Sequence, residues 1–182
     1  NINLPYVVMD NFVYGLTKKQ TSPTSPEGFK SKTDPTGAID RPINPMKKLV
    51  YGGASFVGRT HAAQVKHMME MFERAIKHPG FSVVEVQSEC VVFYPGIFDN
   101  ANPRKGGEFE IIEEKKWDDT EEDKCRHDVT DENAAYELAS LQYPGKFGVF
   151  YEADRPTKNQ LEQQWIDASR EKVGEKSSAE IL

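Results

Sequence analysis

The residues best suited to chemistry follow a short apolar run near the start of the sequence, in the stretch MDNFVYGLTKKQTSPT at residues 9–24. The side-chain oxygen of Asn11 and the carbonyl oxygen of Val13 are ligands that a hard cation accepts, and Mg²⁺ is often shared between such oxygens and phosphates. Gly15 allows a ligand to approach the backbone closely, because it has no side chain. The stretch therefore has the composition of a site for a magnesium-bound phosphate group.

Two further side chains of this stretch suit an anion. Thr17 supplies a hydroxyl group and Lys18 supplies a positive charge, and both groups bind phosphates or carboxylates. An alternative without any ligand stays open, because an Asp-Asn pair also ends strands and begins turns.

Composition limits the classes of protein to which the chain belongs. Its 182 residues suffice for one domain of ordinary size. Hydrophobic residues make up 37% and charged residues 29%, and the formal net charge of −6 argues against a nucleic-acid surface. The sequence has no apolar run near the roughly 20 residues that a membrane span needs. Two cysteines, Cys90 and Cys125, make no disulfide framework, which favours a reducing compartment and a cytoplasmic protein.

Strand and helix patterns alternate in the first half, and this alternation predicts an α/β fold with a parallel sheet and right-handed crossovers. The expected strands span residues 4–9, 54–60 and 81–88, and the expected helices span 45–53 and 62–78. Ligands of open parallel sheets bind outside the carboxyl ends of the strands. A long loop is predicted at 10–44, and it begins at such an end, which is where the candidate residues lie.

The first strand is expected to be buried, since apolar runs of this kind usually lie inside parallel sheets that are covered on both faces. Such a strand needs neighbours, and we therefore expect the chain to be the C-terminal portion of a larger protein or a protein cut short at its N-terminus. The helix at 62–78 is expected to bury one face, which carries Val65, Met68, Met69, Phe72, Ala75 and Ile76.

The second half of the chain has a different character. Residues 108–123 hold nine acidic residues and two lysines, which indicates a solvated excursion, with a short strand at 109–112. The other expected elements are a helix at 131–142, a strand at 146–153 and a helix at 157–173. The last helix begins with a Thr157/Gln160 capping box and presents Leu161, Trp165 and Ala168 on one face.

The stretch at 9–24 closely resembles a signature of the β subunits of 2-oxoacid:ferredoxin oxidoreductases. In that family, Asp-Asn-x-x-Tyr-Gly-Leu-Thr-x-Gly-Gln-x-Ser-Pro-Thr belongs to the thiamine-diphosphate site. The resemblance continues in INPMKKLVYGGASFVGR, in FSVVEVQSECVVF, and in HDVTDENAAYELA and GKFGVFYEADRPT near the end. These last segments look most like the longer 2-oxoglutarate-type β subunits. The sequence departs from the signature at Lys19, where the family usually has glycine.

The resemblance implies roles for individual residues. The implied cofactor-binding residues are Asn11, Val13, Gly15, Leu16 and Thr17. Of these, Asn11 would bind Mg²⁺ through its side chain and Val13 through its carbonyl oxygen, while the others would line the diphosphate and thiazolium end. Lys18 would be the catalytic residue, close to the substrate carboxylate.

Cys90 is implied as a ligand of a [4Fe-4S] cluster, since it ends the segment that resembles the family's Gly-Phe-Ser-x-Val-x-x-x-Ser-x-Cys pattern. Without the resemblance, Cys90 would be a small core residue at the end of a strand. The family's Gly-Asp-Gly-Asp motif and paired cysteines are not in this sequence. As written, the chain would therefore complete neither the thiamine site nor the cluster site by itself.

The resemblance also implies the fold and the activity. The fold would be a three-layer thiamine-diphosphate-binding fold with a mostly parallel sheet that lacks its N-terminal part. Residues 1–95 would be the C-terminal part of the binding domain, and residues 96–182 a C-terminal extension with an acidic loop, a strand and helices. The activity would be oxidative decarboxylation of a 2-oxoacid, foremost 2-oxoglutarate, to acyl-CoA and CO₂. Electrons would pass through the [4Fe-4S] cluster to ferredoxin, and an α subunit would complete the active site.

Two other functions stay open. A non-redox thiamine-dependent decarboxylase or synthase would share the fold, but it would need no cluster ligand at Cys90. A truncated, non-catalytic scaffold subunit would account for Lys19 and for the missing motifs.

A zinc site is not favoured. Cys125 and His127 lie two residues apart, but no CxxC or HxxxH spacing accompanies them, and zinc needs about four ligands. The other histidines are expected at the surface or at helix ends rather than as ligands; they are His61, His67 and His78.

Overall fold

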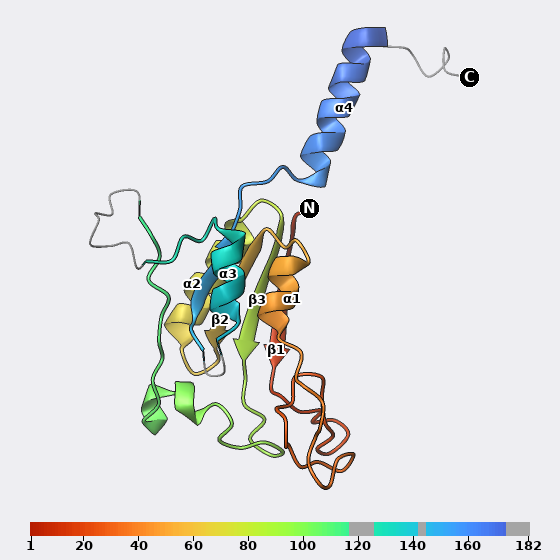
Figure 1. Cartoon of the computed structure of the whole chain (residues 1–182). Coiled ribbons are helices and arrows are strands. Elements are labelled where there is room, and N and C mark those ends of the chain that lie inside the picture. Colours follow the sequence, from red (N-terminus) through yellow and green to blue (C-terminus); the bar gives the residue numbers. More distant parts are fainter. Residues whose placement is uncertain (117–125, 142–144, 174–182) are drawn as a thin grey trace.

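A four-stranded sheet is the centre of the computed structural model (Figure 1). The structure describes residues 1–116, 126–141 and 145–173. The strands are β1 (Leu4–Asp10), β2 (Phe56–His61), β3 (Phe81–Gln87) and β4 (Gly148–Glu152), in the order β1-β3-β2-β4. β3 pairs in parallel with both β1 and β2, and β4 pairs antiparallel with β2. The prediction of an α/β fold with a mostly parallel sheet is thus confirmed.

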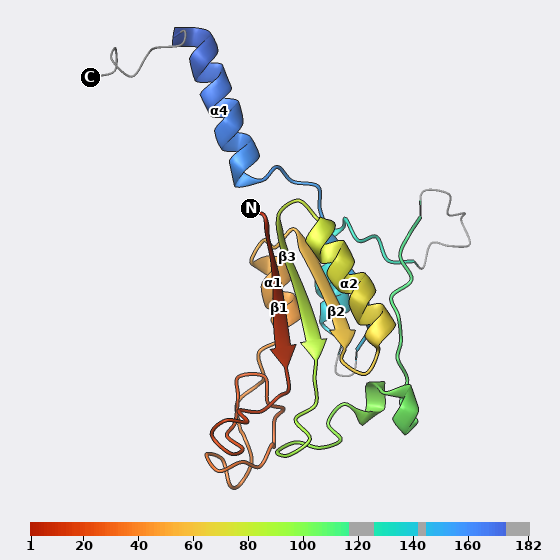
Figure 2. The same cartoon turned by 180° about the vertical axis from the view of Figure 1, so that it is seen from behind.

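Helices cover both faces of the sheet and give three layers (Figures 1 and 2). The helices are α1 (Pro45–Tyr51), α2 (Val65–Lys77), α3 (Glu132–Ala139) and α4 (Lys158–Val173), with short 3₁₀ turns at Asp99–Ala101 and Pro103–Lys105. α1 and α3 lie on one face and α2 on the other. Local capping sets where they begin: the side chain of Asn44 accepts the Lys47 amide before α1, and that of Asp131 accepts two amides before α3.

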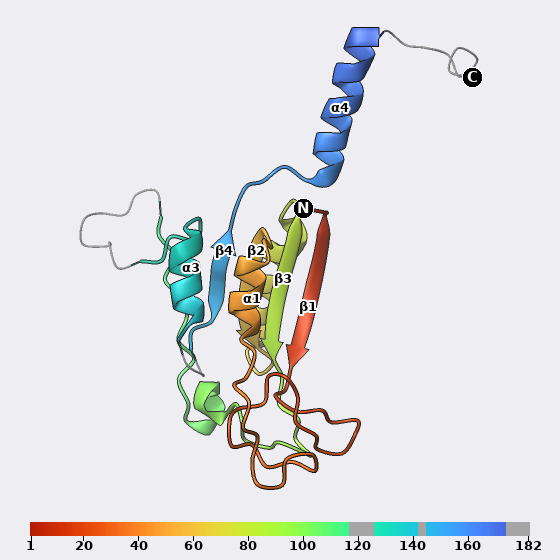
Figure 3. The same ribbon diagram turned by 45° about the vertical axis from the view of Figure 1, so that its right-hand side comes forward.

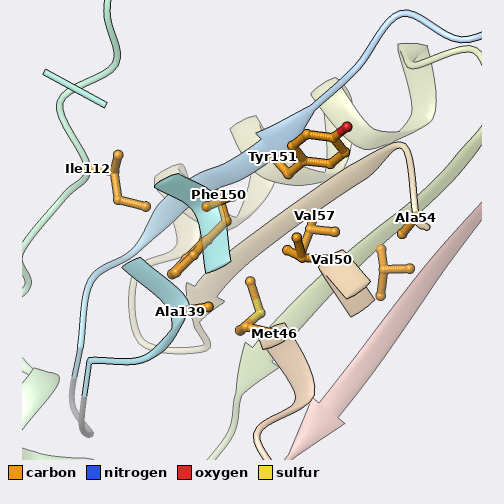
Figure 4. Close-up of a cluster of buried hydrophobic side chains, with 10 residues drawn as sticks. Met46, Val50, Ala54, Val57, Ile112, Ala139, Phe150 and Tyr151 are labelled. Carbon is orange, nitrogen blue, oxygen red and sulfur yellow. The ribbon is translucent and has the colours of Figure 1, made fainter. Parts of the chain in front are cut away.

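The main hydrophobic core lies between the sheet and the pair α1 and α3 (Figure 4). Met46 and Val50 of α1 meet Val57 of β2 and Phe150 of β4, and all four are almost completely buried. A second cluster on the opposite face joins α2 to β2, β3 and β4. β4 thus attaches the second half of the chain to the sheet that the first half forms. The domain boundary expected at residue 95 stays a prediction.

The prediction that the first strand is buried is wrong. β1 is the edge strand, and only its last residue, Asp10, is buried, while Tyr6 is 55% and Met9 71% exposed. An apolar run indicates that a strand is suited to burial. It does not indicate whether other segments of the described chain cover that strand.

The predicted face of the long helix is only partly correct. Met68, Phe72 and Ala75 pack toward the sheet, but Val65, Met69 and Ile76 are exposed, and Met71 takes a buried position instead. The strand expected at 109–112 is reduced to a single bridge between Ile111 and Phe147. The expected acidic excursion falls partly on 117–125, which lies outside the described residues.

α4 extends away from the sheet, at the end opposite to the long loop (Figure 1). Its predicted capping box is present, since the Thr157 amide donates to Gln160 Oε1 at 2.7 Å and the Gln160 amide donates to Thr157 Oγ1 at 3.3 Å. Its apolar side chains are not packed, and Trp165 is 71% exposed. Among the described helices, none combines the length and the apolar character that crossing a membrane would require.

Candidate functional site

Two segments that are distant in the sequence lie side by side at the carboxyl ends of the parallel strands (Figure 3). One is the loop after β1, and the other follows β3, where the Ser88 amide donates to the Asp10 carbonyl at 2.9 Å. A small core of Val13, Phe29 and Ala38 joins them, and Cys90, Phe93 and Tyr94 pack against it. The structure therefore brings together the two segments that the sequence marks for cofactor chemistry.

Asn11 and Val13, the candidate Mg²⁺ ligands, are linked to each other. The Val13 amide donates to Asn11 Oδ1 at 3.1 Å, which makes the turn that an Asp-Asn pair at a strand end predicts. An amide oxygen accepts two hydrogen bonds, and within the described part of the chain Asn11 Oδ1 accepts only the one from Val13, which leaves its second lone pair for a ligand. The turn alternative and the ligand hypothesis are thus compatible.

The next residues form a tight loop that is closed by paired backbone bonds between Tyr14 and Gln20, at 3.0 and 3.3 Å. Inside it, the Lys18 amide donates to the Gly15 carbonyl at 3.0 Å, and the Thr17 hydroxyl donates to the Tyr14 carbonyl at 3.3 Å. The Leu16 side chain is fully exposed. Leu16, Thr17 and Lys18 therefore project from the protein and line no enclosed site among the described residues.

Three residues of this loop have left-handed backbones although they are not glycine: Phe12 at φ 57°, Lys18 at φ 61° and Lys19 at φ 71°. The chain must reverse direction between Tyr14 and Gln20, which explains the two lysines. Such conformations cost about 1–2 kcal/mol for a residue with a side chain, and they gather at functional sites. Lys19, the departure from the family signature, thus adopts a conformation that glycine tolerates best.

Cys90 lies directly against the candidate thiamine segment. A side chain added at Gly15 would place its first carbon 3.6 Å from Cys90 Sγ and 3.8 Å from Phe93. Cys90 is a free thiol and half-buried. Glu89, next to it, accepts from the Gly96 amide and from Lys105 Nζ, which fixes the course of the segment.

A row of buried polar side chains, which the sequence alone did not predict, crosses the three parallel strands. Asp10, Gln87 and His61 are the last residues of β1, β3 and β2, and the strand register places them side by side. Each has one buried polar atom without a hydrogen-bond partner among the described residues: Asp10 Oδ2, Gln87 Oε1 and His61 Nε2. Unpartnered buried groups are costly, so they mark an unusual place in the fold. In the sequence, each of these three residues is a polar residue at the end of an apolar strand, which was a usable signal. Their alignment, however, depends on the strand register, which the sequence does not give.

The prediction that His61 lies at the surface or at a helix end is wrong, because it is buried at the end of β2. Its Nδ1 accepts the Ala63 amide at 3.0 Å, so the neutral ring carries its proton on Nε2. Burial lowers the pKa of His61, against the opposing effect of Glu89. His61 is therefore neutral near pH 7, and its Nε2 is buried without a hydrogen-bond partner among the described residues. His78 is also buried, and it contacts Ser55 Oγ at 2.9 Å.

One residue pair behind this row is a buried ion pair. Arg59 Nε donates to Glu85 Oε2 at 2.6 Å, and both side chains are almost fully buried. The Arg59 guanidinium also lies over the Phe150 ring of β4, 5.4 Å from its centre. Burial raises the pKa of Glu85, Arg59 opposes that effect, and the nearby Asp10 adds to it. We infer that burial prevails because the pair is so well shielded from water.

A pocket of about 690 Å³ opens beside this pair. Phe12, Asn44, Arg59 and Gln87 contribute to its wall, with Glu27 and Arg41 among its exposed residues. Its guanidinium and amide groups suit an anionic group, although none of the candidate residues from Leu16 to Lys18 lines it.

The described residues offer part of a cofactor site. Asn11 and Val13 provide two oxygens, which fits Mg²⁺ where phosphates and water supply the rest. No three histidine, cysteine, aspartate or glutamate side chains in the described part of the chain could hold a metal ion together. Cys125 lies outside the described residues, and the ring of His127 contacts the Phe150 carbonyl at 2.7 Å.

Comparison with known proteins connects this geometry to a family. The family described as "Thiamine pyrophosphate enzyme, C-terminal TPP binding domain" matches residues 1–86. The chain is 38% identical over 112 residues to the Mycobacterium tuberculosis 2-oxoglutarate oxidoreductase subunit KorB, covering 62% of this chain and 30% of that one. It is 33% identical over 154 residues to the Saccharolobus solfataricus 2-oxoacid:ferredoxin oxidoreductase subunit beta, covering 84% of this chain and 49% of that subunit.

A solved structure agrees with these sequence relatives. The chain is similar to a chain of 2-oxoglutarate:ferredoxin oxidoreductase from Magnetococcus marinus, which was solved with 2-oxoglutarate, coenzyme A and succinyl-CoA bound. The TM-score is 0.74 at 32% identity, over 98% of this chain and 55% of that one. The chain thus spans about half of the length of that chain, and half or less of the length of the two relatives.

The first prediction concerns the buried ion pair. We expect Arg59→Leu to lower the free energy of unfolding of the full chain by about 3–5 kcal/mol at pH 7, because Glu85 would lose its partner. Arg59→Leu/Glu85→Gln should recover most of this loss, since no buried charge is left. Urea unfolding of the wild type, both single variants and the double variant measures the coupling. Equal losses in Arg59→Leu and in the double variant would refute it.

The second prediction concerns pH. Because the pKa of Glu85 is raised above 4.5 on folding, the folded chain keeps a proton that the unfolded chain releases. The stability from this proton is fully present below about pH 4.5, and it is lost as the pH rises through the folded pKa. The unfolding free energy of the wild type, minus that of Glu85→Gln, should therefore fall as the pH rises from 4.5. The exposed Glu171→Gln is the control, and a constant difference for Glu85→Gln would contradict the raised pKa.

Proposed function

Because this chain is similar to subunits of 2-oxoglutarate and 2-oxoacid:ferredoxin oxidoreductases over 30–55% of their length, we propose that it forms the cofactor-binding part of such a β subunit. The reaction would be the CoA-dependent oxidative decarboxylation of 2-oxoglutarate, with ferredoxin as the electron acceptor. An α subunit would complete the active site in the cytoplasm.

The observation that carries this proposal is the position of Cys90 against Gly15, where the added side-chain carbon would lie 3.6 Å from Cys90 Sγ. A non-redox thiamine enzyme would need no cluster ligand beside its thiamine loop, whereas a cysteine does lie there in this chain. In an oxidoreductase that passes electrons from thiamine to an iron-sulfur cluster, the two sites must be close. The contact therefore favours the redox function over a non-redox decarboxylase or synthase.

For thiamine diphosphate, Asn11 and Val13 would hold the Mg²⁺ of the diphosphate, with Gly15 leaving room for the cofactor. Thiamine supplies the carbanion chemistry of decarboxylation, and the protein positions it. The turn between Asn11 and Val13 fixes the two oxygens relative to each other before any ligand arrives. Such preorganisation lowers the cost of binding.

Lys18 would bind the substrate carboxylate. Its left-handed backbone and the bond from its amide to the Gly15 carbonyl hold it at the tip of the loop. Its side chain is exposed and has no ion-pair partner among the described residues, so its charge is available to an anion. Both pyruvate and 2-oxoglutarate carry a carboxylate that Lys18 would accept, and the second carboxylate of 2-oxoglutarate would need another partner.

The [4Fe-4S] cluster fits only in part. Such a cluster takes about four thiolates, and the described residues hold one cysteine, Cys90. The other thiolates would come from elsewhere in the oxidoreductase, because one cysteine does not hold a cluster by itself.

The third prediction tests the reaction. We expect the complete oxidoreductase containing this chain to reduce methyl viologen with 2-oxoglutarate only when CoA is present, and more slowly with pyruvate. Absorbance of reduced viologen measures the rate. No reduction by a complex in which thiamine and the cluster have been quantified would refute the proposed function.

The fourth prediction separates the two cofactors. Cys90→Ala should lose the cluster absorbance and ferredoxin reduction while thiamine binding persists. Asn11→Ala should raise the Mg²⁺ and thiamine concentrations for half-saturation by about tenfold or more, with cluster absorbance retained. Cys125→Ala and the exposed Asn159→Ala are the matched controls and should behave as the wild type. Unchanged cofactor requirements in Asn11→Ala, or an intact cluster in Cys90→Ala, would overturn the respective role.

A further inference from the structure

We propose that Lys19, Lys30 and Lys32, called here the lysine patch, are a docking surface for a small acidic electron-carrier protein. The inference rests on the proposed function, because it concerns the partner that receives the electrons. It assigns to this chain a surface that the candidate cofactor residues do not include.

Backbone contacts hold the lysine patch together. The Lys32 amide donates to the Lys19 carbonyl at 3.0 Å, which joins the two limbs of the long loop. Lys30 follows the buried Phe29, whose ring lies under the Lys19 ammonium at 5.4 Å from its centre. The three lysines thus belong to one surface, although Lys19 and Lys32 are 13 positions apart in the sequence.

The charges of the lysine patch are available to a partner. Lys30 and Lys32 are exposed and Lys19 is half-exposed. None of the three has an ion-pair partner within the part of the chain that the structure describes. By contrast, Lys105, also at this end of the molecule, is neutralised by Glu89 and Asp99. Positive side chains on one surface without ion-pair partners favour an acidic partner over a basic one.

The lysine patch lies one layer of rings away from Cys90. Phe29 packs on Tyr94 with ring centres 4.5 Å apart, and the Tyr94 amide donates to the Cys90 carbonyl at 2.9 Å. Cys90 packs against the same small core as Phe29. A protein seated on the lysine patch would therefore sit next to the residue that the proposed function assigns to the cluster.

The local charge is opposite in sign to that of the whole chain. Residues 18–32 hold four lysines and one glutamate, whereas the chain has a net charge of −6. A locally positive surface on an acidic protein steers an acidic partner to one place and repels it elsewhere. A nucleic acid would meet that overall repulsion over a much larger surface, so an acidic protein is the better occupant.

The fifth prediction tests this surface in the complete oxidoreductase with Lys30→Glu/Lys32→Glu. We expect kcat/KM for ferredoxin to fall by about tenfold or more at low ionic strength, with a flatter salt dependence. The rate with methyl viologen, a small cation that needs no docking surface, should match the wild type. The control is Arg170→Glu/Lys172→Glu, which makes the same charge change on α4, at the opposite end of the molecule.

Each contrary result has a distinct meaning. An unchanged kcat/KM for ferredoxin, or an equal fall in the α4 control, would overturn the docking surface while viologen reduction still supports the proposed function. A raised KM for CoA in the viologen assay would assign the lysine patch to that substrate instead, and would also overturn the proposal. Stronger binding of single-stranded DNA than of ferredoxin to the wild type would do so too. Absence of viologen reduction in the wild type would refute the proposed function and this inference together.

Discussion

The parallel pairing of β3 with both β1 and β2 is the constraint on which the functional end of this molecule depends. Because all three strands run in the same direction, their carboxyl ends meet at one edge, with Asp10, Gln87 and His61 in register. The loop after β1 and the segment after β3 must then leave the sheet side by side. The closeness of Gly15 and Cys90, which are 75 residues apart in the sequence, follows from this pairing and needs no special contact.

Burial of charge at the same edge has a cost that the surrounding packing must offset. A buried ion pair is weak support for stability, because removing two charges from water is expensive. Arg59 nevertheless joins three strands, since it lies on β2, binds Glu85 of β3 and covers Phe150 of β4. It also reaches the wall of the pocket. The pair therefore ties the second half of the chain to the edge where the candidate residues lie.

Much of the fold and part of the site were predictable from the sequence. Apolar periodicity located the four strands and four helices of the body to within a few residues, and the motif at 9–24 located the loop. Periodicity does not reveal which strand forms an edge, so the exposure of β1 was missed. The strand register decides which polar side chains align, so the row of Asp10, Gln87 and His61 could not be predicted. The buried face of α2 also differs from the predicted face by part of a turn, so that Met71 lies in the core where Met69 was expected.

Lys19 combines an unfavourable backbone conformation with a positive charge at the surface of the loop. Its φ of 71° is one that glycine adopts freely, and the family signature usually has glycine at this position. A lysine there costs about 1–2 kcal/mol of backbone strain, of which its ammonium over the Phe29 ring returns about 0.5–1 kcal/mol. Local stability therefore does not favour lysine over glycine. A positive charge that is useful to a partner supplies a reason for lysine, and the same reason applies to the other two residues of the lysine patch, Lys30 and Lys32.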